Sequence, residues 1–439
     1  MISILSSYRV TPSEATPNCS LLLCETEQIN APNHAFTIYV YKPNHKPSAP
    51  HEISNLVHTM RDSLAKILVH YYPLAGRLHM IEGRRFEVEC NAKGVQLLEA
   101  ESTKSLDDYG DFEPNDTIKD LIPKVDYNKP IEQLPLMLLQ LTRFSCGGFI
   151  VGTAISNVLV DGISGTHFIN SWAKLARGDT LEELDMPLVS KMVLSSDTKT
   201  KSCFDHKEFK PLPLVLGQSN TTEESNKETS LAMLKLTKEM VENLKKKANE
   251  GNEGRAYSRF ESISAHIWQC VVKARDGDYN QPTVVRIVAG VRSRLNPPLP
   301  LNYFGNATYP TLTPTCLSGD IVSKPLSHVA HKIREAIEVL NDEYLRSGFG
   351  LIRMQNDVGW LRGIFIRNPN LSIWSWISNM PTYGPDFGWG RPVYMGPGTV
   401  RGDGRANIMP GAEDGSVLIA IRLQCAHVEA FKEFFHKGI

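Results

Sequence analysis

The stretch FIVGTAISNVLVDGISGTHFINSWAKLA, residues 149–176, places an apolar run directly before a segment with helical periodicity. Residues 149–155 are apolar and rich in β-branched side chains, which is typical of a strand. After Asp161 and Gly162 the apolar side chains recur at helical spacing, and Gly178 suits a C-terminal cap. At the start of that helix a carboxylate can accept backbone N–H bonds and meet the positive end of the helix dipole. We therefore expect Asp161 and Gly162 to have a structural role at a strand-to-helix turn.

The whole chain has the composition of a globular protein with more than one domain. It contains 439 residues, of which 41% are hydrophobic and 22% charged, and this length is too great for one compact core. The formal net charge is −1, so no overall field favours nucleic acid or an anionic membrane. We expect a small-molecule or protein partner, no nucleic acid and no membrane.

The N-terminal segment and the cysteines indicate a cytoplasmic protein. MISILSSYRVTPSEATPN has neither the basic region nor the long apolar run of a secretory signal. The cysteines are scattered without CxxC pairs, which predicts reduced thiols, most of them buried. They are Cys19, Cys24, Cys90, Cys146, Cys203, Cys270, Cys316 and Cys425.

Periodicity along the chain predicts alternating strands and helices in two halves. Residues 194–230 are polar with a Pro-rich centre, which predicts a mobile crossover linker between an N-terminal domain, 1–193, and a C-terminal domain, 231–439. Strands are expected over 35–42, 85–90, 95–99, 134–145, 149–155, 231–236 and 284–291. Helices are expected over 51–70, from Asp161 to Gly178, directly after 236, over 260–273 and from Ser327 to about Leu345.

Two kinds of ligand site can be considered from residue types alone. None of the thirteen histidines has the spacing of a metal-binding motif, so we expect no metal. The Lys245–Lys247 cluster could hold a phosphorylated ligand or form a solvated helix face.

Several separated motifs, in this order along the chain, resemble the BAHD acyltransferases, plant enzymes that move acyl groups from coenzyme A thioesters. They are YPLAGRL at 72–78, SNVLVDG at 156–162, RSRLNPPLPLNYFGN at 292–306 and DFGWGRPVYMGPG at 386–398. The resemblance covers essentially the whole chain. The segments CNAKGVQLLEAES, at 90–102, and LARGD, at 175–179, are most similar to the spermidine and shikimate hydroxycinnamoyl transferases.

The resemblance implies a two-domain α/β fold of the chloramphenicol acetyltransferase type, with mixed sheets flanked by helices and a channel between the domains. It implies acyl-CoA as co-substrate, no tightly bound cofactor, and a monomer. In the family an HxxxDG histidine deprotonates an acceptor hydroxyl or amine, which attacks the thioester. Asp161 of that motif would pair with an arginine, here Arg292 or Arg294, and Asp386 would belong to a structural loop.

Two departures from the family pattern concern the reaction itself. Asn157 stands where the histidine is expected, and a carboxamide cannot act as a general base near neutral pH. Relatives usually carry a Thr-Ser-Trp triplet whose threonine and tryptophan bind the developing oxyanion. Here Trp374 replaces the threonine, while Ser375 and Trp376 remain. The loss of a base and of an oxyanion donor would each slow ordinary acyl transfer by roughly 10²-fold or more.

The ligand-holding residues, by contrast, resemble those of the family. Ser262, Ser264, Lys245 and Lys247 lie in stretches similar to the coenzyme A side. Arg362 matches the arginine that grips an acceptor carboxylate in shikimate-type relatives, and Ser375 is a further substrate contact.

Three functions therefore stay open. The first is an altered acyltransferase that moves a hydroxycinnamoyl-type group to an amine, such as a polyamine, or to a hydroxyl, with slow turnover that rises with pH. The second is a cyclisation, isomerisation or lyase reaction that needs no acceptor. The third is a ligand-binding protein without catalysis. A substitution introduced to trap a bound substrate would account for Asn157 but not for Trp374.

Overall fold

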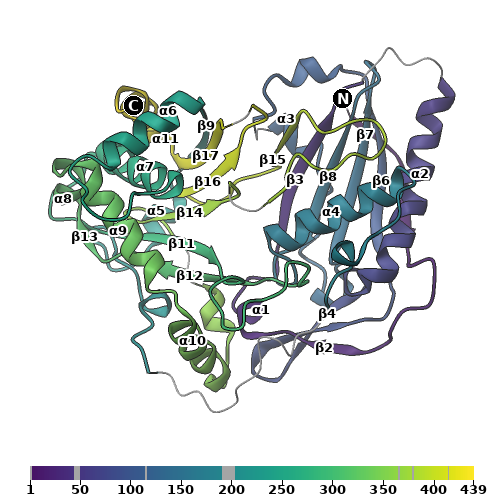
Figure 1. The fold of residues 1–439 in the computed structure, drawn as a ribbon, viewed down its shortest axis with the longest axis horizontal. Helices are drawn as coiled ribbons and strands as arrows, with labels where there is room; N and C mark the ends of the chain where they lie inside the picture. The colour runs from purple at the N-terminus through teal and green to yellow at the C-terminus, as the bar shows by residue number, and fades with distance from the viewer. Residues whose placement is uncertain are drawn as a thin grey trace.

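The computed structural model describes residues 2–43, 50–113, 116–189, 203–363, 366–377, 380–413 and 415–439. Two α/β domains lie side by side, and each is built on a six-stranded sheet (Figure 1). Both sheets mix parallel and antiparallel pairs, which confirms the predicted fold. No helix in the described part of the chain is long and apolar enough to cross a membrane.

The N-terminal sheet has the predicted strand over 149–155 near its middle. Along this strand Val151 and Ile155 face one core cluster, and Ile150 and Ala154 face another, so both faces of the sheet are covered. In spatial order the strands are β1 (Ile2–Val10), β6 (Val95–Ser102), β7 (Met137–Phe144), β8 (Phe149–Ser156), β3 (His34–Tyr41) and β15 (Tyr394–Pro397). One face packs against α2 (Pro50–His70) and α4 (Gly162–Ala176). The other packs against the segment that holds η3 (Leu106–Tyr109) and α3 (Asp116–Lys119).

Shorter elements surround this sheet. A small second sheet joins β2 (Ser20–Leu22), β5 (Arg85–Glu89) and β4 (Arg77–Ile81). Single turns of helix are α1 (Glu25–Gln28), η1 (Tyr72–Ala75), η2 (Glu82–Arg84), η4 (Ile131–Gln133) and η5 (Glu183–Asp185).

The C-terminal sheet packs its apolar face against five helices. In spatial order its strands are β12 (Thr308–Leu312), β11 (Val285–Gly290), β14 (Leu371–Ser375), β16 (Arg405–Pro410), β17 (Val417–Gln424) and β9 (Thr229–Leu236). The helices are α6 (Lys238–Ala248), α7 (Arg259–Arg275), α8 (Ser318–Ser323), α9 (Leu326–Glu338) and α11 (Cys425–Lys437). The remaining elements are α5 (Thr222–Asn226), η7 (Lys207–Phe209), α10 (Asp342–Met354), η8 (Gly359–Gly363), and the paired strands β10 (Pro282–Thr283) and β13 (Cys316–Leu317).

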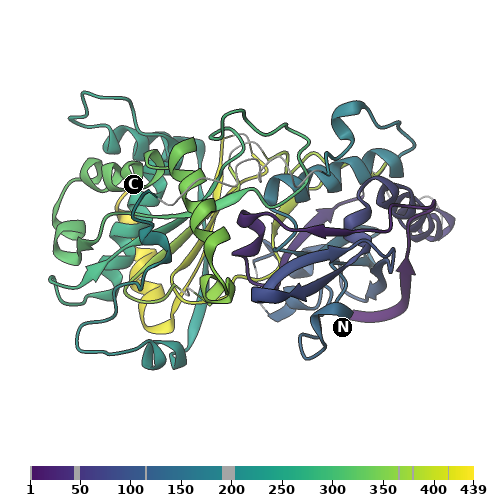
Figure 2. The same ribbon diagram turned by 90° about the horizontal axis from the view of Figure 1, so that it is seen from below.

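Strand β15 crosses from the C-terminal half of the chain into the N-terminal sheet, where it pairs with β3 (Figures 1 and 2). The loop before β15 also packs on the N-terminal domain, because the Phe387 ring lies edge-on against Tyr41 and Trp172 of the N-terminal core. Asp386 shapes the loop by accepting the backbone N–H bonds of Gly388 and Gly390 at 2.8 and 2.9 Å. The boundary predicted at 231–439 is thus wrong for 386–398, which belongs structurally to the N-terminal domain.

Two further predictions need correction. The single helix expected from Ser327 to about Leu345 is two helices, because Asn341 caps the second by accepting the Tyr344 N–H at 2.9 Å. In the crossover segment His206 and Glu208 are buried, and residues 190–202 lie outside the described part, so mobility of this segment stays a prediction. Most cysteines were expected to be buried, but four thiol residues are exposed. These are Cys19, Cys146, Cys203 and Cys425.

Candidate functional site

A cavity of about 920 Å³ lies between the two domains and contains the altered motif. The N-terminal domain contributes side chains of β3 and β8, the turn at Asn157, and the first turns of α4. The C-terminal domain contributes β11, the 374–376 segment, β16, and residues that precede and begin α7. Asn157 therefore lies inside the interdomain cavity.

Asn157 is held in place by both domains. Its backbone N–H donates to the Asn33 carbonyl at 2.9 Å, and its carbonyl accepts from Nδ2 of Asn306, in the C-terminal half, at 2.6 Å. The side-chain Nδ2 donates to Asn33 Oδ1 at 2.6 Å. Within the described chain its Oδ1 has no hydrogen-bond donor. Asn157 thus offers the cavity a fixed acceptor that cannot remove a proton.

Asp161 caps α4 and joins the two domains. Its Oδ1 accepts the Ser164 N–H at 2.9 Å and Nη2 of Arg292 at 3.0 Å, and its Oδ2 accepts Nη1 of Arg292 and the Ala307 N–H. Asp161 and Arg292 are each only 8% exposed. The expected pairing with an arginine is therefore made by Arg292. Arg294 instead donates to the carbonyls of Ile337 and Leu340.

No residue in the described cavity wall takes over the role of a base. The lining includes no histidine, and its two acids are Asp161, paired as above, and Glu261, which accepts from Arg334 at 2.9 Å. Tyr39 also lines the wall, but burial raises the pKa of its phenol, which stays protonated at neutral pH. His34 contacts Tyr127 Oη and the Pro135 carbonyl through its two ring nitrogens and does not line the cavity.

In the segment expected to supply oxyanion donors, residues 374–376, the indole of Trp374 takes the place of a threonine hydroxyl. The indole N–H donates to Ser372 Oγ at 3.0 Å, so this donor is already used within the protein. Trp376 also lines the cavity, and its indole N–H has no acceptor in the described structure. Ser375 Oγ is buried without a partner among the described residues. Trp376 thus remains available as one donor of the triplet.

The residues expected on the coenzyme A side lie outside the cavity. Ser262 and Ser264 are fully buried within α7, and Ser262 Oγ donates to the Ser258 carbonyl. Lys245 pairs with Glu242 on the same helix, and Lys247 Nζ donates to the Gly438 carbonyl at 2.6 Å. Their contact with coenzyme A stays a prediction.

Neighbouring residues of the same segment do line the cavity. Arg255, Ser258 and Phe260 stand at and before the start of α7. Arg255 and Ser258 can donate hydrogen bonds to phosphate oxygens, so they suit the coenzyme A part of a thioester.

Arg362 is anchored elsewhere. Its Nε donates to the Gln28 carbonyl at 2.7 Å, and its guanidinium lies 3.8 Å from the centroid of the Phe86 ring. Arg362 does not line the cavity, so the structure does not place it for an acceptor carboxylate in this site.

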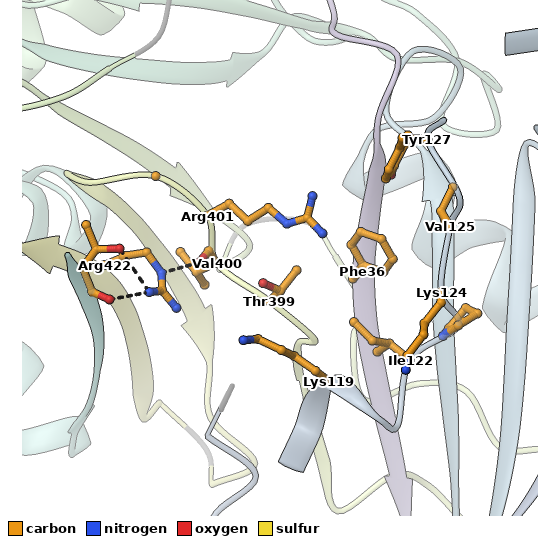
Figure 3. A pocket seen from close by; sticks show the side chains of 13 residues that line it. Phe36, Lys119, Ile122, Lys124, Val125, Tyr127, Thr399, Val400, Arg401 and Arg422 are labelled. Carbon is orange, nitrogen blue, oxygen red and sulfur yellow. Dashed lines mark hydrogen bonds between the residues drawn. The ribbon is translucent and has the colours of Figure 1, made fainter. Parts of the chain in front are cut away.

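A second interdomain cavity, of about 650 Å³, lies around Phe36 (Figure 3). Arg401 lies over the Phe36 ring, and Arg422 donates to the carbonyls of Val400 and Thr229. Lys119 and Lys124 complete its basic lining. It contains no residue of the SNVLVDG motif, so we do not assign the chemistry to it.

The polar cavity residues that the sequence did not predict include Arg405 and Asn407 on β16. The available signal is the alternation Arg-Ala-Asn-Ile over 405–408, which predicts a strand with one polar face. What that face contacts depends on strand order, which the pattern does not contain.

Comparisons with known proteins agree with the fold and the motifs. The model of the Transferase family matches residues 1–437. The hydroxycinnamoyl-CoA:piscidic acid hydroxycinnamoyltransferase of Actaea racemosa is 42% identical, over 100% of both chains. The hydroxycinnamoyl-CoA:5-hydroxyanthranilate N-hydroxycinnamoyltransferase HHT4 of Avena sativa is 38% identical, over 85% of this chain and 84% of its own. The crystal structure of vinorine synthase superposes with a TM-score of 0.75 at 22% identity, covering 98% of this chain and 96% of that one. The chain belongs to the Transferase family, the BAHD acyltransferases, which use acyl-CoA as co-substrate.

Proposed function

We propose that this protein transfers a hydroxycinnamoyl-type acyl group from coenzyme A to the amine of a small acceptor. Asn157 orients the acceptor in this reaction and does not deprotonate it. Relatives that span most of the chain include hydroxycinnamoyltransferases, and two of them are N-hydroxycinnamoyltransferases, which supports both the donor and an amine acceptor.

The observation that carries the proposal is the carboxamide of Asn157 inside a cavity whose described wall holds no free base. A hydroxyl is a weak nucleophile until a base removes its proton, whereas a neutral amine attacks a thioester directly. The geometry therefore favours an amine over a hydroxyl.

The reaction balances without a protein base. The amine nitrogen forms a bond to the thioester carbonyl carbon, and the carbon–sulfur bond then breaks. The departing thiolate takes up the proton that the nitrogen loses. Asn157 Oδ1 accepts an N–H of the attacking amine, and the Trp376 indole N–H faces the developing oxyanion. Holding both reactants in one cavity can supply several kcal/mol of the barrier reduction.

The charges of the cavity wall argue against a polyamine acceptor. A polyammonium ligand needs carboxylates, but both acids of the described wall are paired with arginines. We therefore propose a small monoamine, with the polyamine as a comparison in the test.

The test is thiol release from p-coumaroyl-CoA by the purified full-length protein, with products identified by mass spectrometry. Reactions contain no acceptor, anthranilate, spermidine or shikimate. Release that requires anthranilate, with an amide product, supports the proposal. A rearranged product without acceptor would instead show a cyclase or isomerase, and no reaction in any mixture would show a ligand-binding protein.

Restoring the imidazole provides a second test. Asn157→His should raise the ester-forming rate with shikimate by about 10²-fold at neutral pH, because the base returns. Asn157→Ala is the matched control, since it lacks both the base and the amide and should not gain this activity. No gain in Asn157→His would contradict the assignment of position 157 to the acceptor's reacting group.

We further propose that the protein acts as a cytoplasmic monomer. No disulfide joins its cysteines in the described structure, and four of them are exposed, which suits a reducing compartment. Cell fractionation and light scattering of the purified protein test the two statements separately.

A further inference from the structure

Strand β16 places two polar side chains on the cavity side of the C-terminal sheet. Ala406 and Ile408 point into the apolar core, so the alternate residues Arg405 and Asn407 point to the opposite face. Asn407 pairs in register with Trp374 of the neighbouring strand. Trp374 and the two polar residues are therefore neighbours on one sheet face.

Arg405 belongs to a row of like charges across the sheet. Ser372 stands between Arg286 and Arg405 in register, and Arg422 is the partner of Arg405 on the other side. Arg422 is satisfied by the Val400 and Thr229 carbonyls. Within the described structure no carboxylate or carbonyl accepts a hydrogen bond from the Arg405 guanidinium, and its Nε is buried without a partner. Burial lowers the pKa of Arg405 to about 10, which leaves it cationic at neutral pH.

The close contact of Arg405 is aromatic. Its guanidinium carbon lies 4.5 Å from the centroid of the Trp374 ring, a cation–π arrangement. Trp374 is itself fixed by the bond from its indole N–H to Ser372 Oγ. Tryptophan at this position thus acts as a platform that positions the Arg405 guanidinium.

One uncharged polar group beside this cation also lacks a partner. Asn407 is only 4% exposed, yet its Oδ1 has no partner in the described chain. Buried polar atoms nearly always have partners in folded proteins, and Asn407 lines the cavity. Its Oδ1 is therefore suited to a polar ligand group. Ser375 is in register with Ile408, which points into the apolar core, so its hydroxyl does not join this group.

We infer that Arg405 and Asn407 form a subsite for the carboxylate of an acidic substrate, a role distinct from that of Arg362. The guanidinium supplies parallel N–H donors, and the Asn407 amide completes the hydrogen bonds of the carboxylate and of a neighbouring hydroxyl or amine. The inference rests on the proposed function in one respect: the acid that binds at this subsite is the acyl acceptor, an amino acid or a hydroxy acid. It also explains why a cavity without free acids would suit such a substrate better than a polyamine.

The decisive experiment compares each acid with its methyl ester, because the ester keeps the shape and removes the charge. Isothermal titration calorimetry measures the affinity of the full-length protein for anthranilate, shikimate and their methyl esters. At least one acid should bind about 10- to 100-fold more tightly than its ester. Equal affinities for both pairs would overturn the inference.

Variants assign the preference to Arg405. In Arg405→Leu, and in Arg405→Gln as a polar variant of similar reach, the acid-to-ester ratio should fall to about 1 while ester affinity is kept. Arg401→Leu is the matched control, since it removes an exposed arginine of the second cavity, and it should preserve the ratio. A ratio kept in Arg405→Leu would overturn the assignment. So would a tenfold loss of affinity for coenzyme A alone, because Arg405 would then bind phosphate.

The outcome can be separated from that of the proposed function. Acid-selective binding that depends on Arg405, without any thiol release, would refute the transfer reaction and retain the subsite. Anthranilate-dependent thiol release without acid selectivity would retain the reaction and refute the subsite.

Discussion

Arg292 and Arg405 are both arginines of the cavity wall, yet their surroundings are opposite. Arg292 is matched by the Asp161 carboxylate, and Arg405 by the face of an indole. Taking a guanidinium out of water is unfavourable unless a partner compensates, and a cation–π contact compensates less than a carboxylate does. Arg292 therefore stabilises the fold, whereas the guanidinium of Arg405 can still donate hydrogen bonds to a ligand.

The buried pair predicts a large loss of stability when one partner is removed. Asp161→Asn leaves Arg292 uncompensated and should lower the free energy of unfolding by about 3–5 kcal/mol. Asp179→Asn breaks an exposed ion pair with Arg177 and should change it by less than about 1 kcal/mol. Urea denaturation of both variants measures the difference, and equal losses would contradict a structural role for Asp161.

A buried histidine predicts a pH-dependent loss of stability. Burial lowers the pKa of His266 to about 4, and one of its ring nitrogens contacts the Phe435 carbonyl at 2.9 Å. The unfolded chain binds this proton near pH 6.5, so stability falls as the pH drops from about 6.5 to 4, by up to about 3 kcal/mol, and is unaffected above pH 7. His266→Gln should flatten the curve in this window. Parallel curves for the two proteins from pH 7 to 4 would refute the assignment.

Sequence reasoning reached the roles of some residues and not of others for a physical reason. Asp161 was placed correctly because a cap and its helix are adjacent in the chain. Arg405 was missed because its neighbour Trp374 is brought to it by the parallel pairing of β14 and β16. The anchor of Arg362 could not be predicted, because Gln28 is far away in sequence. A sequence pattern therefore predicts contacts between residues close together in the chain. It does not predict which residues of different strands become neighbours in a sheet.

At the scale of elements, strand β15 binds the two halves of the chain together. Its loop depends on Asp386, which accepts two backbone N–H bonds, and on Gly388 and Gly390 at φ of 103° and 91°. Both glycines have the left-handed backbone that other residues rarely adopt.

Removing the loop's acceptor should therefore destabilise the molecule. Asp386→Ala leaves two N–H groups without their partner and should lower the unfolding free energy by about 1–3 kcal/mol. Gly388→Ala should also destabilise, through backbone strain at φ 103°. Gly277→Ala is a control at negative φ with open space around it, and should be near neutral. Thermal unfolding of the three variants tests the ranking.

Helices with a strong apolar stripe were predictable to within a few residues, such as 51–70 and 260–273. The division of the predicted 327–345 helix was not, because Asn341 was read as a helical residue rather than as a cap. Strand β1 was missed because its residues alternate weakly and most are exposed or half-buried. Strands and helices that are only partly buried have weak hydrophobic periodicity and are therefore the hardest to predict from sequence.

At the scale of the whole molecule, the N-terminal sheet is complete only with residues from the C-terminal half. Without β15, strand β3 becomes an unprotected edge, and the pocket for Phe387 in the N-terminal core is exposed. Residues 1–202 expressed alone should therefore aggregate or remain partly folded. Co-expression with residues 203–439 should restore a soluble complex, detected by size-exclusion chromatography and circular dichroism. A monodisperse, fully folded 1–202 fragment would show that the crossing strand is dispensable.

Hydrogen bonds between the two domains limit how a substrate can enter the cavity. They join Asn306 to Asn157, and Arg292 and Ala307 to Asp161. Because these bonds join the two domains at the reacting centre, a hinge motion that separated the domains would break contacts of the centre itself. Substrate entry without such a motion predicts that a covalent cross-link between the domains leaves the turnover rate unchanged, which thiol release before and after cross-linking measures.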